Sequence, residues 1–115
     1  MSPKSHSRPV AKRQPRAPIF AALGDETRLL LLAKLSGGQP YSISQLTEGS
    51  KLTRQAITKH LRVLERVRIV RCVRAGRERR FEFAPQPIEE MKRYLDSVSQ
   101  QWDQALSRLK SFVED

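Results

Sequence analysis

Apolar residues in the N-terminal half of the chain predict two consecutive helices. A short apolar run at Ile19, Phe20, Ala22 and Leu23 ends at Gly24, which is expected to stop or bend the first helix. Asp25 is a suitable N-cap for a second helix from Glu26 to about Ser36, because its carboxylate can accept unpaired amides of the first turn. An almost continuous apolar surface makes this helix a candidate for the centre of the fold: Leu29, Leu30, Leu32, Ala33 and Leu35.

The next segment predicts two helices joined by a tight turn. Ser42 or Ser44 can cap a third helix, which Gly49-Ser50 interrupts. A fourth, basic helix over residues 52–65 follows, with Thr53 as its N-cap. Its apolar residues Ala56, Ile57, Leu61 and Leu64 share one side, and its long polar residues share the other: Arg54, Gln55, Thr58, Lys59 and Arg62. This arrangement is typical of a helix-turn-helix, whose second helix enters the DNA major groove.

After about Arg66 the pattern changes from helical spacing to strand spacing. Ile69, Val70, Cys72 and Val73 form a run rich in β-branched residues, and Phe81 and Phe83 then alternate with charged residues. The sequence Ala75-Gly76-Arg77 between the two runs reads as a hairpin tip. A basic hairpin directly after a helix-turn-helix is a wing. The arginines at or near its tip are placed to touch phosphates or to enter a minor groove: Arg74, Arg77, Arg79 and Arg80.

A long terminal helix is predicted from about residue 87 to 113. Its apolar positions alternate in steps of three and four, which is the heptad spacing of a narrow packing seam: Ile88, Met91, Leu95, Val98, Trp102, Ala105, Leu109 and Phe112. The same helix of a second copy is the expected partner, with Ile19 and Phe20 joining the interface. Packing across its own domain is the alternative. The predicted fold class is thus mainly α with a small β-hairpin: a winged helix-turn-helix with a long C-terminal dimerisation helix.

The net charge of +10 is unevenly distributed. Residues 51–85 carry eleven Lys or Arg against three Glu, and the first sixteen residues carry five basic residues and no acid. A field concentrated in this way favours a polyanionic partner, with a merely solvated charged surface as the alternative. We expect residues 1–17 to form a disordered basic arm and residues 18–115 to form one DNA-binding domain.

The cysteine content and the hydropathy of the chain indicate where in the cell the protein is expected. Cys72 is the only cysteine, so the chain has no intramolecular disulfide, and a cytoplasmic location is expected. No segment approaches the roughly 18 apolar residues of a membrane span, and no membrane partner is expected. No phosphate loop, nucleophile elbow or metal-ligand spacing is present, so the sequence does not predict an enzyme.

Three stretches together resemble the ArsR/SmtB family of bacterial winged-helix repressors. They are the run from Ala22 to Arg28, the run from Ala56 to Leu64, and the run from Ala75 to Phe81. The resemblance extends from about Ala21 to the C-terminus. It implies a homodimer bound to an inverted-repeat operator, usually near its own promoter, and release of DNA when an effector binds.

The sequence departs from the metal-sensing members of that family. One family site uses two cysteines where this chain has Ser42 and Ser44, and hydroxyls are poor ligands for the metals concerned. A second family site uses His and carboxylates on the last helix, which here has Asp96 and Asp103 but no His. We therefore predict no metal site and no cofactor. A redox role for Cys72 is a minor alternative, because such sensors in the family normally pair two thiols. His60 is expected to pack or to contact phosphate.

We interpret the chain as a sequence-specific transcriptional regulator, an autoregulated repressor that binds double-stranded DNA as a homodimer. Arg54, Gln55, Thr58 and Lys59 are expected to approach base edges, and Thr53, Arg62 and the wing arginines to hold phosphates. A small-molecule effector is an open partner. Two alternative functions remain: a nonspecific architectural or RNA-binding protein, and a module whose C-terminal helix binds a different protein.

Overall fold

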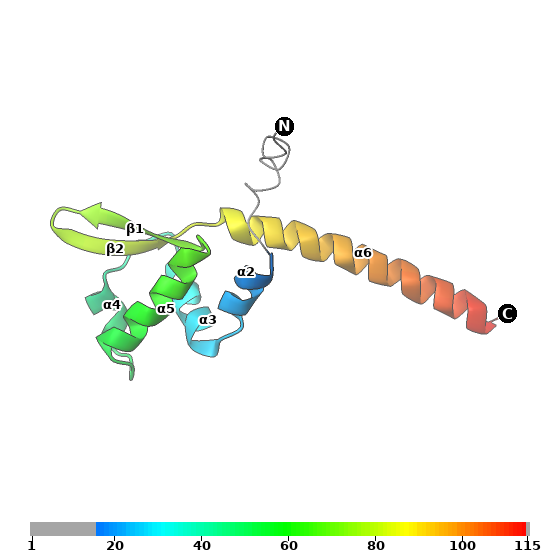
Figure 1. The fold of residues 1–115 in the computed structure, drawn as a ribbon, viewed down its shortest axis with the longest axis horizontal. Coiled ribbons are helices and arrows are strands. Elements are labelled where there is room, and N and C mark those ends of the chain that lie inside the picture. The colour runs from blue at the N-terminus through cyan, green and yellow to red at the C-terminus, as the bar shows by residue number, and fades with distance from the viewer. Residues whose placement is uncertain (1–15, 115) are drawn as a thin grey trace, which may run out of the picture.

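The computed structural model describes residues 16–114, which form five helices and one antiparallel hairpin (Figure 1). The predicted fold class is confirmed. The elements are α2 (Arg16–Leu23), α3 (Glu26–Leu35), α4 (Ile43–Thr47), α5 (Arg54–Arg66), β1 (Val70–Ala75), β2 (Glu78–Phe83) and α6 (Gln86–Glu114). Residues 1–15, on which most of the predicted arm falls, lie outside the described residues.

Three helices begin at side-chain caps that the sequence predicts. The Asp25 carboxylate accepts the backbone N–H of Arg28 at 3.0 Å at the start of α3. Of the two serines considered for α4, Ser42 is the cap, and it forms a reciprocal capping box with Gln45. The Thr53 hydroxyl accepts the N–H of Ala56 at 3.1 Å at the start of α5. These caps fix where the chain turns between helices, and so set the spacing of the helix-turn-helix.

The core lies between α2, α3, α5, the hairpin base and the first turns of α6. Its buried members are Ile19, Ala22, Leu31, Leu32, Leu35, Leu46, Ile57, Leu61, Leu64, Ile69, Val70, Phe81 and Met91. The prediction for α3 was partly wrong. Leu31 rather than Leu30 is buried, and Leu29, Leu30 and Ala33 are exposed. Four successive leucines do not show which side of a helix faces the core, so the packing of α3 against α2, α5 and β2 decides which of them turn inward.

The hairpin pairs Val70 with Phe83 at its base and Ala75 with Glu78 at its end, which leaves Gly76-Arg77 as a two-residue turn. Gly76 has φ 67°, as the first turn position requires in a type II′ hairpin. Tyr41 extends the sheet by one bridge, exchanging backbone hydrogen bonds of 2.9 and 2.7 Å with Phe81. The hairpin is therefore anchored to the body at its base, while its tip projects (Figure 1).

Helix α6 lies against the body only through its first turns. Met91 is buried, and the ring of Tyr94 lies 6.3 Å from the ring of Phe20 in α2. The Arg16 guanidinium stacks over the ring of Tyr94 at 4.2 Å. Arg16 is also the first residue of α2, so this helix begins inside the range 1–17 that was predicted to be a disordered arm. Beyond Tyr94 the helix extends away from the body towards the C-terminus (Figure 1).

Candidate nucleic-acid interface

Helix α5 divides cleanly into an apolar face and a polar face. Ile57, Leu61 and Leu64 are fully buried in the core, whereas Ala56, which was predicted to share their side, is half-buried and lines the polar face. The six predicted polar residues, with Ala56, line one shallow depression on the other side of the helix: Thr53, Arg54, Gln55, Thr58, Lys59 and Arg62. The structure therefore brings together all the α5 residues that the sequence assigned to DNA, whereas the wing arginines lie elsewhere. Because the depression is basic and lined by long donors, it suits the acceptors of a major groove.

Besides Thr53, which caps α5, two of these side chains already have partners in the free protein. The Arg54 guanidinium donates a hydrogen bond of 2.6 Å to the Ser44 hydroxyl of α4, across the helix-turn-helix. Sequence reasoning missed this contact, since it considered Ser44 only as a cap or a metal-ligand position. The Thr58 hydroxyl donates to the Arg54 carbonyl at 2.7 Å, which leaves its oxygen as an acceptor. Arg54 is thus held in place at the start of α5 before DNA arrives.

The arginines of the wing differ in their surroundings. Arg74 and Arg79 are exposed and face each other directly across the two strands, an arrangement that is unfavourable without an anion nearby. Arg77 is exposed in the turn. Arg80 donates to Glu78 at 2.8 Å, and Arg71 donates to Glu82 at 2.6 Å. The arginines available for phosphates at the tip are therefore Arg74, Arg77 and Arg79, whereas the charge of Arg80 is already paired.

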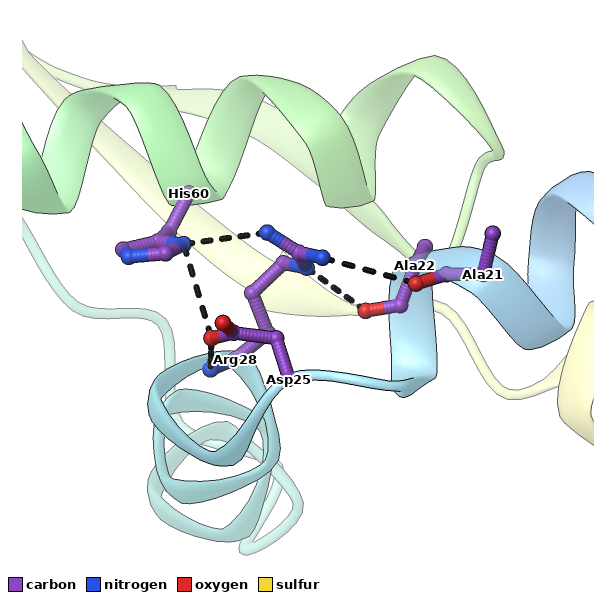
Figure 2. Close-up of polar contacts among 5 residues, drawn as sticks. All are labelled: Ala21, Ala22, Asp25, Arg28 and His60. Carbon is purple, nitrogen blue, oxygen red and sulfur yellow. Dashed lines mark hydrogen bonds and ion pairs between the residues drawn. The ribbon is translucent and has the colours of Figure 1, made fainter.

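A polar cluster behind α5 fixes the helix to the body (Figure 2). Arg28 of α3 donates to the carbonyl of Ala22 at 2.6 Å and to that of Ala21 at 3.4 Å, at the end of α2. The same guanidinium donates to Nδ1 of His60 in α5 at 3.2 Å. One arginine therefore joins three helices. The packing role considered for His60 is confirmed by this contact, which points the ring to the body rather than to the basic depression.

Asp25 completes this cluster, with its carboxylate 3.8 Å from Nδ1 of His60. The hydrogen bond from the Arg28 backbone N–H is the main cause that lowers the pKa of Asp25 below its ordinary value. Partial burial opposes this effect, and the charge of Arg28 reinforces it. The sequence offered only a weak signal for the cluster, because the spacing of Asp25 and Arg28 says nothing about His60.

The predicted dimer residues fall into two groups. Ile19 and Met91 are buried in the core of their own domain, and Phe20 and Ile88 are half-buried against it. Ile19 and Met91 are therefore removed from the predicted interface, because the first turns of α6 already pack on α2. The remaining positions lie on the projecting part of α6, where Leu95, Trp102, Leu109 and Phe112 are exposed and Val98 and Ala105 are half-buried.

The residues considered for metal binding have other surroundings. Ser42 is buried as the cap of α4, Ser44 accepts from Arg54, and Asp96 and Asp103 are exposed on α6. Within residues 16–114, the structure holds no group of three His, Cys, Asp or Glu side chains placed to bind a metal ion. The free Cys72 is half-buried in β1. No helix in this part of the chain is long and apolar enough to span a bilayer.

Known proteins match this arrangement. Residues 25–71 match the family described as bacterial regulatory protein, arsR family. An uncharacterized HTH-type transcriptional regulator of Bacillus subtilis, YuzN, is 39% identical over 79 residues, covering 64% of this chain and 86% of the relative. An HTH-type transcriptional regulator of Mycobacterium tuberculosis is 28% identical over 95 residues, covering 83% of this chain and 85% of the relative.

Among solved structures, an ArsR-like transcriptional regulator from Rhodococcus sp. RHA1 has a TM-score of 0.79 and 37% identity. The match covers 85% of this chain and 89% of that chain. The relatives are transcriptional regulators, which agrees with the basic face of α5 and the arginine-rich wing. The chain therefore belongs to the ArsR family of DNA-binding transcriptional regulators.

Proposed function

We propose that the protein is a homodimeric repressor whose two α5 helices bind the half-sites of an inverted-repeat operator. The observation that carries this proposal is the apolar face of α6 beyond Tyr94. Six large apolar side chains there are at least half exposed in the single chain: Leu95, Trp102, Leu106, Leu109, Phe112 and Val113. Exposed apolar surface on this scale is unfavourable in water and marks an association surface.

The spacing of this face favours a second copy of the same helix as its partner. Leu95, Val98, Trp102, Ala105, Leu109 and Phe112 follow the heptad steps that let two helices pack along their length. Phe20 and Ile88 lie at the body end of the same face, where a partner helix would meet α2. A two-fold dimer presents both α5 helices to one side of a duplex, and the matching half-sites are then one helical turn apart, about 34–36 Å.

Within each half-site, the polar face of α5 supplies the contacts. Arg54, Gln55, Thr58 and Lys59 approach base edges, because they lie on the exposed side of the helix near its N-terminus. Thr53 and Arg62 flank that set and hold phosphates. The wing adds phosphate contacts through Arg74, Arg77 and Arg79, with a smaller contribution from Arg80 because Glu78 pairs with it.

Repression and autoregulation rest on the family resemblance. A dimer bound over a promoter excludes RNA polymerase from it without further chemistry. The palindromic operator is then expected upstream of the protein's own coding region.

Selection of duplexes from a randomised library, combined with sedimentation equilibrium, tests this function. We expect a dimer in solution and selected sites that are inverted repeats with half-site centres 10–10.5 base pairs apart. Bulk genomic DNA added as competitor should leave the operator complex largely intact. A monomer at micromolar concentration, or recovery of unrelated sequences, would contradict the proposal and favour the partner-binding or architectural alternative.

A further inference from the structure

We propose that the groove between α3 and the helix-turn-helix binds an amphiphilic carboxylate, a small molecule with an apolar chain and one anionic head. The groove has a volume of about 610 Å³. This is within the range of roughly 300–1,000 Å³ that is usual for small-molecule sites. It lies apart from the basic depression on α5 and from the apolar face of α6, and no residue predicted from the sequence for DNA or dimer contact lines it.

The floor of the groove is apolar and joins three elements. Leu31 comes from α3, Leu46 from α4 and Ile57 from α5, and all three are buried. Leu30 forms a wall and is 65% exposed, although it is a large apolar side chain on a body helix. A ligand with a hydrocarbon chain would cover Leu30, and the hydrophobic effect favours that burial.

The charge at the rim selects the head group. The ionisable residues that line the groove are Lys34 at the end of α3 and Lys51 in the turn before α5. Neither lysine forms a salt bridge within residues 16–114. The Ser50 hydroxyl also lines the groove, and its proton remains available because its oxygen accepts from the N–H of Leu52. Two ammonium groups and a hydroxyl donor around an apolar floor match a carboxylate with an apolar tail.

A second groove, at the base of the wing, has a lining with a different charge pattern. It is lined by Glu65, Glu89 and Glu90 together with Arg68 and Arg71, so it offers both signs of charge. Such a lining does not select an anion. Of these two grooves, only the one beside α3 combines an apolar floor with rim charges of a single sign.

Occupancy of this groove would oppose DNA binding, an expectation that rests on the proposed function. Lys51 is two residues before Thr53, so a bound carboxylate neutralises positive charge beside the start of α5. The groove is also lined by Leu46 and Ile57, which belong to the two helices of the helix-turn-helix, and by residues of α3, which packs against α5. A wedge at that junction biases the angle of α5 relative to α3.

Decanoate below its micellar concentration is the probe, and binding to the full-length chain without DNA is measured by isothermal titration calorimetry. We expect saturable binding of one decanoate per chain and at least tenfold weaker binding of decanol and decyltrimethylammonium. Lys34→Glu and Leu30→Glu should each weaken decanoate binding at least tenfold. Leu30 and Lys34 are both exposed, so the variants should fold, whereas Lys110→Glu on α6 serves as the matched charge control and should bind as wild type.

The single tryptophan distinguishes this groove from the apolar face of α6. Trp102 lies on that face, so decanoate bound there would change its fluorescence, and decanoate bound beside α3 would not. Binding that shifts Trp102 emission and ignores Lys34→Glu would overturn the proposal. Equal binding of all three decyl compounds would overturn it as well.

A second measurement separates this inference from the proposed function. Decanoate should lower the affinity of the wild type for the selected operator about tenfold. It should leave the operator affinity of Leu30→Glu unchanged. Absence of decanoate binding with intact operator recognition would overturn this inference alone. Decanoate binding by a chain that selects no operator would support the site and overturn the proposed function.

Discussion

Helices α5 and α6 have the same kind of sequence pattern, but they expose opposite faces. Both are amphipathic, but the apolar face of α5 is covered by its own domain, and Ile57, Leu61 and Leu64 are completely buried. The apolar face of α6 is covered only as far as Met91, and Phe112 is 80% exposed. In α5 the polar face is therefore the one free to bind a partner, whereas in α6 it is the apolar face.

The difference shows that a periodic pattern identifies a helix and its two faces, but not the partner of either face. Which face remains free depends on what the rest of the chain packs against it. The following predictions test this contrast, beginning with the largest effect.

Truncation of a leucine in each helix should have unequal effects on the folded monomer. Leu61→Ala removes a fully buried side chain of α5 and should lower the free energy of unfolding by about 2–5 kcal/mol, through lost burial and the cavity left behind. Leu109 is 57% exposed in the single chain. Leu109→Ala should therefore change the free energy of unfolding of the dilute monomer by less than about 0.5 kcal/mol. Urea unfolding followed by circular dichroism measures both, and equal losses would refute the contrast.

A charge in the α6 seam should separate the two copies without unfolding either. Leu109→Glu places an unpaired carboxylate in the proposed interface. At a cost of about 3 kcal/mol, this weakens the dimer roughly 100-fold. Ser107→Glu, in the same turn but off the seam, is the control and should stay dimeric. Sedimentation equilibrium distinguishes them, and an unchanged mass for Leu109→Glu would remove this face from the interface.

Two arginines should differ in what they contribute to DNA binding. Arg54→Ala should lose about 1–3 kcal/mol of discrimination at one base position, because it removes the proposed base-edge contact. Arg77→Ala should weaken operator and scrambled duplexes equally and reduce the slope of log K against log salt by about 0.9. Fluorescence anisotropy at several salt concentrations measures both effects.

Arg93→Ala, exposed on α6 away from the seam, is the matched control and should behave as wild type. If Arg54→Ala kept full sequence selectivity, Arg54 would have no part in reading bases. A nonspecific loss from Arg54→Ala identical to that from Arg77→Ala would lead to the same conclusion.

The end of α5 holds a residue in a conformation that glycine adopts more easily. Arg68 has φ 67° and closes the helix, with its N–H donating to Glu65 at 2.9 Å and that of Ile69 to Leu64 at 3.0 Å. Arg68→Gly should raise the free energy of unfolding by about 0.5–1 kcal/mol, because relief of the left-handed strain exceeds the added entropy of the unfolded chain. Thermal unfolding measures the change, and a lower midpoint would show that the Arg68 side chain is itself stabilising.

Acid should weaken the N-terminal cap of α3, because the main stabilising contact of the Asp25 carboxylate is with the N–H of Arg28. The pKa of Asp25 is lower in the folded protein than its ordinary value, so its stabilising effect is complete above that ordinary value. The effect is lost as the pH falls through the lowered pKa. Asp25→Asn keeps a capping side chain but should show a shallower loss of stability in this acidic range than wild type. Parallel slopes in urea titrations at several pH values would exclude a contribution from Asp25.

The features predicted correctly from sequence depend on short-range chemistry. Asp25, Ser42 and Thr53 cap their helices through amides three positions further on, so each cap is visible in a few residues. The hairpin turn at Gly76 is equally local. The polar face of α5 followed from helical spacing alone.

The features that were missed depend on distant parts of the chain. Arg28 and His60 are 32 positions apart, and only the packing of α3 on α5 brings them together. The heptad seam is regular from Ile88 onward, yet Met91 belongs to the core because α2 covers that turn. Leu30 and Leu31 are adjacent and chemically identical, and their opposite environments come from the positions of α2, α5 and β2 around α3.

The contact of Arg28 with α2, α3 and α5 has a consequence for operator architecture. In a dimer held together by α6, helix α2 lies between α6 and the rest of each copy. The Arg28 guanidinium then limits movement of α5 relative to the two-fold axis, because it bonds to both α2 and α5. A dimer built in this way has little freedom to follow half-sites whose separation is altered. Inserting one base pair at the centre of the palindrome moves one half-site by 3.4 Å and rotates it by about 36° about the duplex axis. The spacer length should then be as strictly selected as the bases themselves.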